Sequence, residues 1–562
     1  MKTLDWILLL GTQAFILIYG WWKSRKKSEG KDYFDGGGLS WFTVGISVMA
    51  TQASAITFLS APGKAFDDGL RFIQYYFGLP LAIIVVSAVA ITIYKQKKAR
   101  TAYEILEDRY NIYVRLVTAA LFLIQRGLAA GFTIFAPALV LSAILGWDIS
   151  LTVVFTGFIV LVYTLTGGAK AIAETQKTQM FIIIVGMLVA TILMIQRLPI
   201  SFSDSLYIAG ASGKLNAIDT QFSLKGEYNI WSGLIGGFFL SLSYFGTDQS
   251  QVSRYLTGSS VTQSRLGMIF NGFFKIPMQF GILLIGVILY VFYMFYPAPL
   301  SFNTSLESVL NEEQKIALHT ESEQLRKNHE QLAFQYLDAV KSKDETLKSS
   351  LGAELRNAQT ENVAFRKKVK EEINKVDKSK DTNDTNYIFF YFVYEVLPMG
   401  MLGLIVSVVI SASMSSTSSE LNALATTTTF DFYKRLKKRD MSDDELVKFS
   451  KWSTFVWGVY ATIFALFANR LGTLIEAVNY LGSIFYGTIL GIFLCAFFLK
   501  NTKSWGVLAA AAITQVFIIV LDQYSNDVHF LWFNVIGGLM VPILASVISL
   551  FLKQETIKLS EK

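Results

Sequence analysis

The sequence of 562 residues is poor in the side chains that build catalytic and metal centres, with one cysteine and three histidines. The single cysteine, Cys495, lies inside an apolar run, which excludes a disulfide framework and a cysteine metal site. The spacing of His319, His329 and His529 gives neither a histidine metal cluster nor a local Ser/His catalytic signature. The sequence therefore offers no catalytic or metal centre built on cysteine or histidine.

Charge is also scarce, because charged residues make up 17% of the chain, against about 25% in a typical soluble protein. Hydrophobic residues make up 52%, and the mean hydropathy is +0.43. The apolar residues lie in long blocks rather than in short periodic patterns. These properties exclude a soluble multidomain enzyme and indicate an all-α integral membrane protein embedded in a lipid bilayer. The net charge of +7 is modest, and no nucleic-acid partner is expected.

The apolar blocks predict thirteen membrane spans, because a spanning helix needs roughly 20 mostly apolar residues. Three of the blocks are long enough that a tilt or a break is expected. The predicted limits are 4–22, 40–61, 72–94, 113–144, 150–166, 178–196, 230–246, 267–296, 388–418, 452–469, 472–499, 505–521 and 530–551.

Basic residues predict the orientation of the chain. Almost no charge precedes the first apolar segment, and Lys23, Arg25, Lys26 and Lys27 follow it. A cleaved signal peptide carries its positive charge first, so we expect a retained helix with its N-terminus outside. The loops at 95–100, 254–265 and 434–439 alternate with loops that hold few cations, so the positive-inside rule places them, and the C-terminus, in the cytoplasm. The short loops suit a bacterial cytoplasmic (inner) membrane.

Residues 297–386 interrupt the apolar pattern with a polar, mixed-charge segment. Leucines seven apart in the first half and four apart in the second predict helices at about 304–340 and 344–376, forming a helical hairpin or a weak coiled coil outside the membrane. They are Leu318, Leu325, Leu332, Leu347, Leu351 and Leu355. Two interpretations remain open: a mobile surface insertion without function, or a docking module for an unknown partner.

Polar residues inside two spans predict discontinuous helices. The second span contains Thr51, Gln52, Ser54 and Thr57 at mid-depth, and the seventh ends in a polar run at 241–249. A helix break frees backbone carbonyls that can bind a cation, and it leaves half-helix ends that face a substrate. The two spans are five apart, which fits an inverted pair of five-span units, spans 2–6 and 7–11.

The ninth span carries a dense run of serines at 411–419. Residues three and four apart share one face of a helix, so the Ala412 carbonyl and the Ser415 and Ser416 hydroxyls converge. Neutral oxygen ligands suit a singly charged hard cation such as Na⁺, whereas a divalent ion would require carboxylates. Packing of small residues between helices is the alternative interpretation.

Several of these motifs, in the same order, resemble the sodium/solute symporter family over nearly the whole chain outside 297–386. They are Asp32-Tyr33-Phe34 with Gly36-Gly37-Gly38, Ser54-Ala55-Ile56-Thr57, Gly167-Gly168, Asp248-Gln249 with Arg254, and the serine run continuing into Asn422-Ala423-Leu424-Ala425. The last motif resembles the branch that holds monocarboxylate, vitamin and iodide carriers. The resemblance implies a LeuT-type inverted-repeat fold and Na⁺-driven uptake by alternating access.

The resemblance also implies residues for two sodium sites. The principal site falls on the carbonyls of Ala50, Ala53 and Ala412 and on the hydroxyls of Ser415 and Ser416. A second site of some relatives falls on Gln176, Ser418 and Ser419, with Gln176 in the place of an aspartate. Because a neutral amide supplies no charge, this second site is weakened, and one Na⁺ per transport cycle is expected.

For the substrate site, the resemblance places the aromatic gate on Tyr244 and a lysine of the sugar-carrying branch on Lys275. The sugar contacts of that branch are replaced here by Thr57, Tyr76 and Ser241, although a polar residue remains at Asn479. This pattern argues against a galactose-like site without excluding other sugars.

Arg126, near the middle of the fourth span, offers another anchor, because a buried arginine favours a carboxylate partner. The substrate could supply that carboxylate; alternatively, Arg126 pairs with protein carbonyls or with an acid such as Glu476. Glu420, Asp248 and Lys275 are expected near the cytoplasmic ends of their spans, as gate or surface ion pairs. Gln52 and Thr57, in the broken span, are better candidates for substrate contacts.

Together these observations predict a sodium-coupled symporter that imports a small polar solute, such as a sugar, sialic acid or another organic acid. Because such transport needs no covalent chemistry, no enzyme activity is expected. The alternatives are a sodium-independent carrier or channel, and a transporter-like solute sensor acting through a separate partner. The expected divisions are an N-terminal helix and loop (1–39), a first repeat (40–200), an external loop (201–229), a second repeat (230–296 and 387–500) split by the insertion (297–386), and two C-terminal helices with a short tail (501–562).

Overall fold

The fold was established from a computed structural model, which describes residues 1–24, 34, 38–166, 169–226, 228–378, 380–437, 440–468, 473–525 and 527–553. Within these ranges every named element is helical, and the pairing of Leu39 with Gly258 is an isolated β-bridge. The prediction of an all-α protein is confirmed. Several predicted motif residues lie outside the described ranges, namely Asp32, Tyr33, Gly36, Gly37, Gly167, Gly168, Arg25, Lys26 and Lys27.

Eight helices in the described ranges are long and apolar enough to cross a membrane, so the count of thirteen spans stays a prediction. Two shorter apolar helices, Thr3–Ile16 and Ile149–Leu165, add to them. The eight are Ala55–Gln96, Ile112–Leu145, Ile172–Arg197, Val261–Phe295, Met401–Lys437, Leu474–Phe498, Ser504–Tyr524 and Leu531–Phe551.

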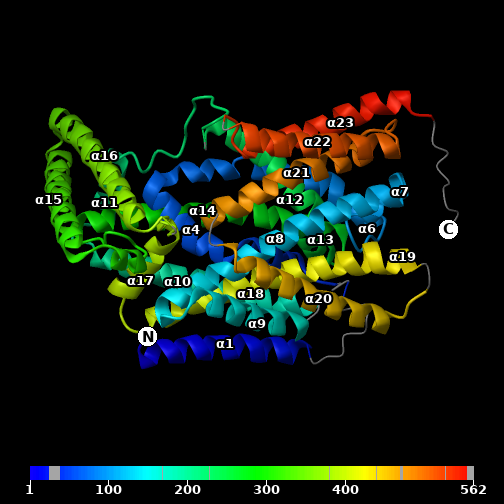
Figure 1. Cartoon of the computed structure of the whole chain (residues 1–562), viewed down its shortest axis with the longest axis horizontal. Helices are drawn as coiled ribbons and strands as arrows, with labels where there is room; N and C mark the ends of the chain where they lie inside the picture. The colour runs from blue at the N-terminus through cyan, green and yellow to red at the C-terminus, as the bar shows by residue number, and fades with distance from the viewer. Residues whose placement is uncertain are drawn as a thin grey trace.

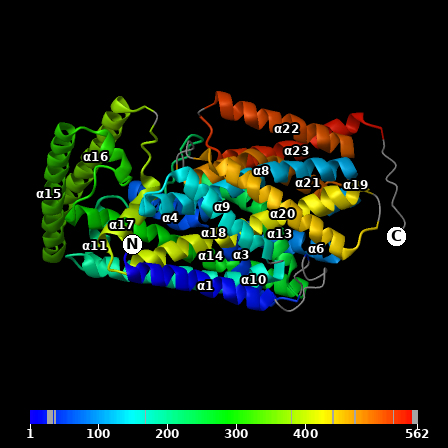
Figure 2. The same ribbon diagram turned by 60° about the horizontal axis from the view of Figure 1, so that its bottom comes forward.

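The helices run along the long axis of the molecule (Figures 1 and 2). Helix α1 (Thr3–Ser24) covers one flank, and α22 (Ser504–Tyr524) and α23 (Leu531–Phe551) cover the opposite one. α1 begins at the end of the bundle that carries the polar insertion, and α23 ends at the other end (Figure 1).

Local sequence signals fix where helices begin and end. Asn111 precedes α8 (Ile112–Leu145), and its side chain accepts hydrogen bonds from the first free backbone N–H groups of that helix. Gly146 ends the same helix in a left-handed conformation, which glycine adopts without steric cost. α8 and α14 (Val261–Phe295) are each continuous, although their lengths left a break open as a prediction.

The second span is broken as predicted. α3 (Trp41–Gln52) ends where Ala53 leaves the helical conformation, Ser54 is extended, and α4 (Ala55–Asp68) begins a new helix. The seventh span is interrupted by the extended residue Asp248, between α12 (Gly237–Thr247) and α13 (Gln249–Leu256). This second break lies at the end of the predicted span rather than within it.

The predicted segment at 388–418 contains a break, one of the two outcomes that its length led us to expect. α17 (Ile388–Val396) stops before Pro398, and α18 (Met401–Thr427) begins after Gly400, which has a φ of 92°. Proline disfavours a helical conformation in the residue before it, and a positive φ favours glycine. The whole serine run therefore lies in the middle of α18 rather than at the end of a longer helix.

The polar insertion forms two antiparallel helices, α15 (Glu312–Ser342) and α16 (Glu345–Val376), beyond one end of the bundle (Figures 1 and 2). Leu318 packs in a small apolar core with Phe365 and Val369. Leu347, a member of the predicted leucine stripe, is instead 46% exposed. The hairpin thus has its own core, and α11 (Phe202–Ala211) and the end of α14 support it.

Candidate sodium and solute site

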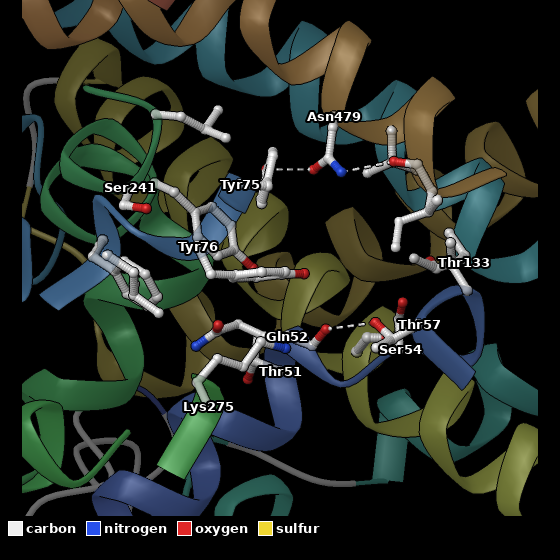
Figure 3. A pocket seen from close by; sticks show the side chains of 18 of the residues that line it. Thr51, Gln52, Ser54, Thr57, Tyr75, Tyr76, Thr133, Ser241, Lys275 and Asn479 are labelled. Atoms are coloured by element: carbon white, nitrogen blue, oxygen red, sulfur yellow. Dashed lines mark hydrogen bonds between the residues drawn. The ribbon is translucent and has the colours of Figure 1, made fainter. Parts of the chain in front are cut away.

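A cavity of about 130 Å³ lies in the middle of the bundle, between the broken span α3/α4, the helices α8, α12, α14 and α18, and α21 (Leu474–Phe498). Figure 3 shows many of the side chains in its wall. The structure brings all the predicted substrate and gate residues to this one cavity. They are Gln52, Thr57, Tyr76, Arg126, Ser241, Tyr244 and Asn479.

The helix break leaves two carbonyls of α3 without their usual backbone partners. The N–H of Ala53 donates to Met49 O at 2.9 Å, and the N–H of Thr57 donates to Ser54 O at 3.0 Å. Within the described ranges, no backbone N–H donates to the carbonyl of Ala50 or Ala53. These oxygens can therefore bind a cation, as unwound helix segments do in transporters.

The serine face of α18 lies against these carbonyls. Ser415 Oγ donates to Ala50 O at 3.0 Å, which joins α18 to α3. Ser416 Oγ donates to Ala412 O at 3.0 Å, and Ser416 also lines the cavity. The predicted ligands of the principal sodium site are all buried, and the set contains only neutral oxygens. This donor chemistry fits a singly charged hard cation.

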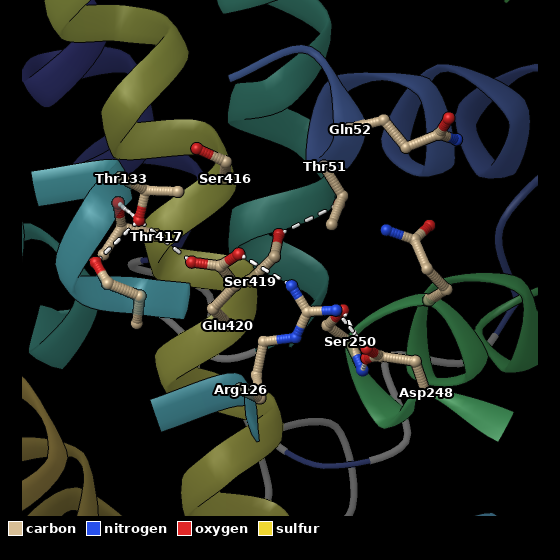
Figure 4. Close-up of polar contacts among 12 residues, drawn as sticks. Thr51, Gln52, Arg126, Thr133, Asp248, Ser250, Ser416, Thr417, Ser419 and Glu420 are labelled. Carbon is tan, nitrogen blue, oxygen red and sulfur yellow. Dashed lines mark hydrogen bonds and ion pairs between the residues drawn. The ribbon is translucent and has the colours of Figure 1, made fainter. Parts of the chain in front are cut away.

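A second polar cluster lies along α18, around Gln176 of α10 (Ala169–Arg197). The Gln176 Oε1 atom accepts from Ser47 Oγ at 2.5 Å. Its Nε2 atom donates to Ser419 Oγ at 2.9 Å, to Ser415 O at 3.2 Å and to Thr51 Oγ1 at 3.3 Å. Figure 4 shows the adjoining contact between Thr51 and Ser419, whose hydroxyls are 3.0 Å apart.

Of the predicted second site, the structure joins Gln176 to Ser419, whereas Ser418 Oγ donates to Ser415 O at 3.1 Å and makes no described contact with Gln176. Sequence reasoning missed Ser47 and gave Thr51 no role in this cluster. Both are one or two helical turns from the break, and helical spacing alone could have placed them on one face of α3.

Arg126 lies in a buried ionic network at one end of the cavity (Figure 4). Its Nη1 atom donates to Glu420 Oε1 at 3.0 Å, and its Nη2 atom donates to Asp248 Oδ2 and to the hydroxyl of Tyr486. Asp248 also caps α13 by accepting from the N–H of Ser250 at 2.8 Å. The charge of Arg126 is therefore balanced by two carboxylates of the protein.

Two expectations about these charges need correction. The suggested partner of Arg126, Glu476, instead pairs with Lys64 at 2.7 Å. Glu420, Asp248 and Lys275 were expected to form gate or surface ion pairs near the cytoplasmic ends of their spans. All three are at least 95% buried, which excludes surface pairs, and Glu420 and Lys275 line the cavity. The pairing of Arg126 with Glu420 and Asp248 could not be recognised because each ion pair joins residues more than a hundred positions apart.

The end of the cavity nearer the insertion is closed by weaker contacts. Tyr75, at the end of the short helix η1 (Gly69–Tyr76), donates to Asn479 Oδ1 at 2.8 Å (Figure 3). The ion pair between Lys64 of α4 and Glu476 of α21 lies beyond this contact. Asn386 Oδ1 also joins these helices, since it accepts from Ser60 Oγ at 2.7 Å and from the N–H of Leu474 at 3.4 Å.

The insertion contacts α4 through an ionic bridge. Arg366 of α16 binds Asp67 at 3.1 Å and Asp384 at 2.9 Å. Burial opposes ionisation of Asp384, but the charges of Arg366 and Lys370 outweigh it and hold the pKa of this carboxyl below its usual range. The hairpin is thus attached to the helix that carries Lys64.

Comparison of the chain with known proteins identifies its family. The sodium:solute symporter family model matches residues 33–313 and 374–514, and leaves out most of the hairpin. The human sodium/iodide cotransporter is 29% identical over 297 residues, which cover 51% of this chain and 44% of the relative. Sodium-coupled monocarboxylate transporter 1 of Xenopus laevis is 30% identical over 268 residues, or 47% of this chain and 42% of the relative.

The match therefore spans less than half the length of these curated relatives. A solved structure, of the substrate-bound outward-open state of a Na⁺-coupled sialic acid symporter, superposes with a TM-score of 0.75 at 21% identity. The superposition covers 98% of each chain and confirms the LeuT-type fold. Since the family model matches most of its length, the chain belongs to the sodium:solute symporter family.

Proposed function

We propose that the protein is a sodium-coupled symporter that imports a small polar solute by alternating access. The observation that carries this proposal is the serine face of α18 lying against the broken span. Ala50, Ala53, Ala412, Ser415 and Ser416 offer carbonyl and hydroxyl oxygens from two helices beside a central cavity. Because Ser416 also lines the cavity, a sodium ion bound here adjoins the solute.

Sodium binding joins α3 to α18, since ligands come from both helices. A cation held between them favours the conformation in which the two helices are close, and the cavity wall is then complete. Solute binding in the same conformation must favour sodium reciprocally, because coupling between two sites is thermodynamically symmetric. This reciprocity is the physical basis of symport and requires no covalent chemistry.

The two ends of the cavity supply the alternating gates. At the insertion end, the Tyr75–Asn479 hydrogen bond and the Lys64–Glu476 ion pair separate for outward opening. At the opposite end, Arg126 and its carboxylate partners must separate for inward opening. Tyr244 lies beside this network, with its ring centroid 5.5 Å from the Arg126 guanidinium, and we propose that it gates the inner path.

We propose a stoichiometry of one sodium ion per cycle. At the second cluster, the amide Nε2 of Gln176 supplies hydrogen atoms to Ser415 O and to the hydroxyls of Ser419 and Thr51. These are the oxygens that a second cation would need. An amide donor in their midst satisfies them without any ion.

The insertion end is the external face in this proposal. The basic residues at 95–100 and 434–437 adjoin α6 (Ile91–Gln96), α7 (Glu104–Arg109) and α19 (Arg435–Lys437), all at the opposite end (Figure 1). The positive-inside rule then places that end in the cytoplasm. The N-terminus lies on the outer side of the cell membrane and the C-terminus on its cytoplasmic side.

The solute is a small organic molecule within the class that the sequence predicts: sugars, sialic acid and other organic acids. Two of the curated relatives are cotransporters of iodide and of monocarboxylates, which favours an anion within that class. The mixed wall of the cavity, with hydroxyls, an ammonium and apolar side chains, fits such a solute.

A thermal-shift screen of the purified protein in NaCl, KCl and choline chloride tests the proposal, followed by uptake into proteoliposomes with an imposed sodium gradient. We expect a solute that stabilises the protein only with Na⁺ and accumulates only when Na⁺ is higher outside. Equal stabilisation and uptake in all three salts would contradict symport and favour a sodium-independent carrier. Solute binding without uptake would favour a sensor.

A further inference from the structure

One cation in the cavity wall has no counter-charge. Arg126 is bound by Glu420 and Asp248, so this trio is already neutral or negative. The other cation in the cavity wall is Lys275 of α14, which is 3% exposed. Among the described residues, its ammonium has no hydrogen-bond acceptor and no carboxylate partner.

Lys275 reaches from α14 into the cavity below Tyr76 (Figure 3). Its Nζ atom lies 5.8 Å from the centroid of the Tyr76 ring. A buried ammonium that keeps its charge is costly unless an anion accompanies it. Arg126 keeps an unpartnered Nε–H, but its charge is already matched by two carboxylates, so an anionic solute beside it would add to a net negative cluster. Lys275 is therefore the better anchor for negative charge on a solute.

The neighbouring wall adds hydrogen-bond donors and apolar surface. The hydroxyls of Tyr76 and Ser241 line the cavity and form no hydrogen bond within the described part of the chain (Figure 3). Both can donate to a carboxylate held at Lys275. Apolar side chains form the remaining wall, namely Ile56, Leu79, Leu240, Phe245, Ile475 and Val478.

We propose that the solute is a small organic monocarboxylate with an apolar body, and that Lys275 binds its carboxylate. The proposal rests on the symport function above and names its substrate class. A neutral sugar would leave Lys275 without a counter-charge. A dicarboxylate would place its second charge against apolar wall or close to Glu420. One ammonium, two hydroxyl donors and apolar surface match one carboxylate on a short hydrocarbon chain.

The test compares acids with their uncharged analogues in equilibrium binding to the purified full-length protein in NaCl. The probes are propionate, lactate, pyruvate and benzoate, with propionamide and benzamide as matched neutral molecules, and succinate and glucose as other classes. We expect at least one monocarboxylate to bind about tenfold more tightly than its amide and than succinate or glucose. Equal affinity for acid and amide, or preference for glucose or succinate, would overturn the proposal.

Lys275→Met removes the charge and keeps a long side chain, and Lys275→Arg keeps the charge. We expect Lys275→Met to weaken carboxylate binding about tenfold or more while amide binding changes little, and Lys275→Arg to retain the preference for the acid. Lys225→Met is the control, because Lys225 forms an exposed ion pair with Asp527. Unchanged carboxylate affinity in Lys275→Met would refute the assignment, and the acid–amide comparison of the unaltered protein decides it if that variant fails to fold.

Sodium binding without solute separates this proposal from the symport function. If Na⁺ stabilises the protein over choline but no monocarboxylate binds, the substrate class is wrong and the sodium site stands. If Na⁺ has no effect and a monocarboxylate binds through Lys275, the role of Lys275 is supported and the proposed sodium coupling is wrong.

Discussion

Two clusters of oxygen atoms lie along α18 and differ in the groups that donate hydrogen bonds to them. In the first, carbonyls freed by the helix break face the hydroxyls of Ser415 and Ser416. In the second, one turn further on, Ser415 O and Ser419 Oγ face the amide of Gln176. Both clusters are buried and uncharged, and both contain serine hydroxyls and carbonyl oxygens.

The difference lies in the mobility of the hydrogen-bond donor. A serine hydroxyl can rotate its hydrogen away and present a lone pair to a cation. The Gln176 amide cannot do so, because its Oε1 atom is held by Ser47 while its Nε2 atom donates to three oxygens. We therefore propose that the first cluster admits a sodium ion and that the second does not.

The largest expected effect comes from Ser416→Ala, which removes a proposed ligand from the first cluster. Losing one oxygen from a buried cation site should cost roughly 1–2 kcal/mol, which raises the sodium concentration for half-maximal uptake about tenfold. Ser407→Ala is the matched control, since Ser407 also donates to a carbonyl four residues earlier on α18, at 2.9 Å. Identical sodium dependence in both variants would remove Ser416 from the site.

A qualitative change is expected from Gln176→Glu, which replaces the amide donor with a carboxylate of the same length. The oxygens around Ser419 and Thr51 would then lack a hydrogen donor and gain a negative charge. We expect a second sodium site, seen as a Hill coefficient for Na⁺ that rises from about 1 toward about 2. Gln176→Leu removes the donor without adding charge and should keep the coefficient near 1; a rise in this control would contradict the account.

The smallest effect is expected from Ser419→Ala. This change removes the hydroxyl that accepts from Gln176 at 2.9 Å but leaves the first cluster intact. The apparent melting temperature should fall by about 1–2 °C through loss of a buried hydrogen bond, while the sodium affinity stays within about twofold. Ser418→Ala provides the comparison, as Ser418 does not bind Gln176. A sodium defect in Ser419→Ala as large as in Ser416→Ala would mean that the clusters form one site.

The parts of this arrangement that follow helical spacing could be predicted from the sequence. Residues 412, 415 and 416 share a face of any helix, and polar residues in an apolar segment indicated the break near Ser54. The end of α17 was also encoded, because Pro398 and Gly400 stand together in the sequence. The length of 388–418 predicted a tilt or a break in this segment without giving its position.

Contacts between distant parts of the chain could not be predicted in the same way. Arg126 meets Glu420 and Asp248 through the packing of α8 against α18 and α13, and several acids offered equal chemistry on sequence grounds. The role of Gln176 likewise depends on the direction of its amide, which the packing of α10 against α3 and α18 decides. The sequence shows that buried polar side chains such as Arg126 and Gln176 need partners, but only the fold determines which residues become those partners.

The most direct test of the account is the number of sodium ions bound by the purified protein at equilibrium, measured with ²²Na⁺ for the unaltered chain and for Ser416→Ala and Gln176→Glu. The account predicts one ion per chain, much weaker binding in Ser416→Ala, and two ions in Gln176→Glu. Two ions in the unaltered chain, or unchanged binding in Ser416→Ala, would contradict the division of α18 into an admitting and an excluding cluster.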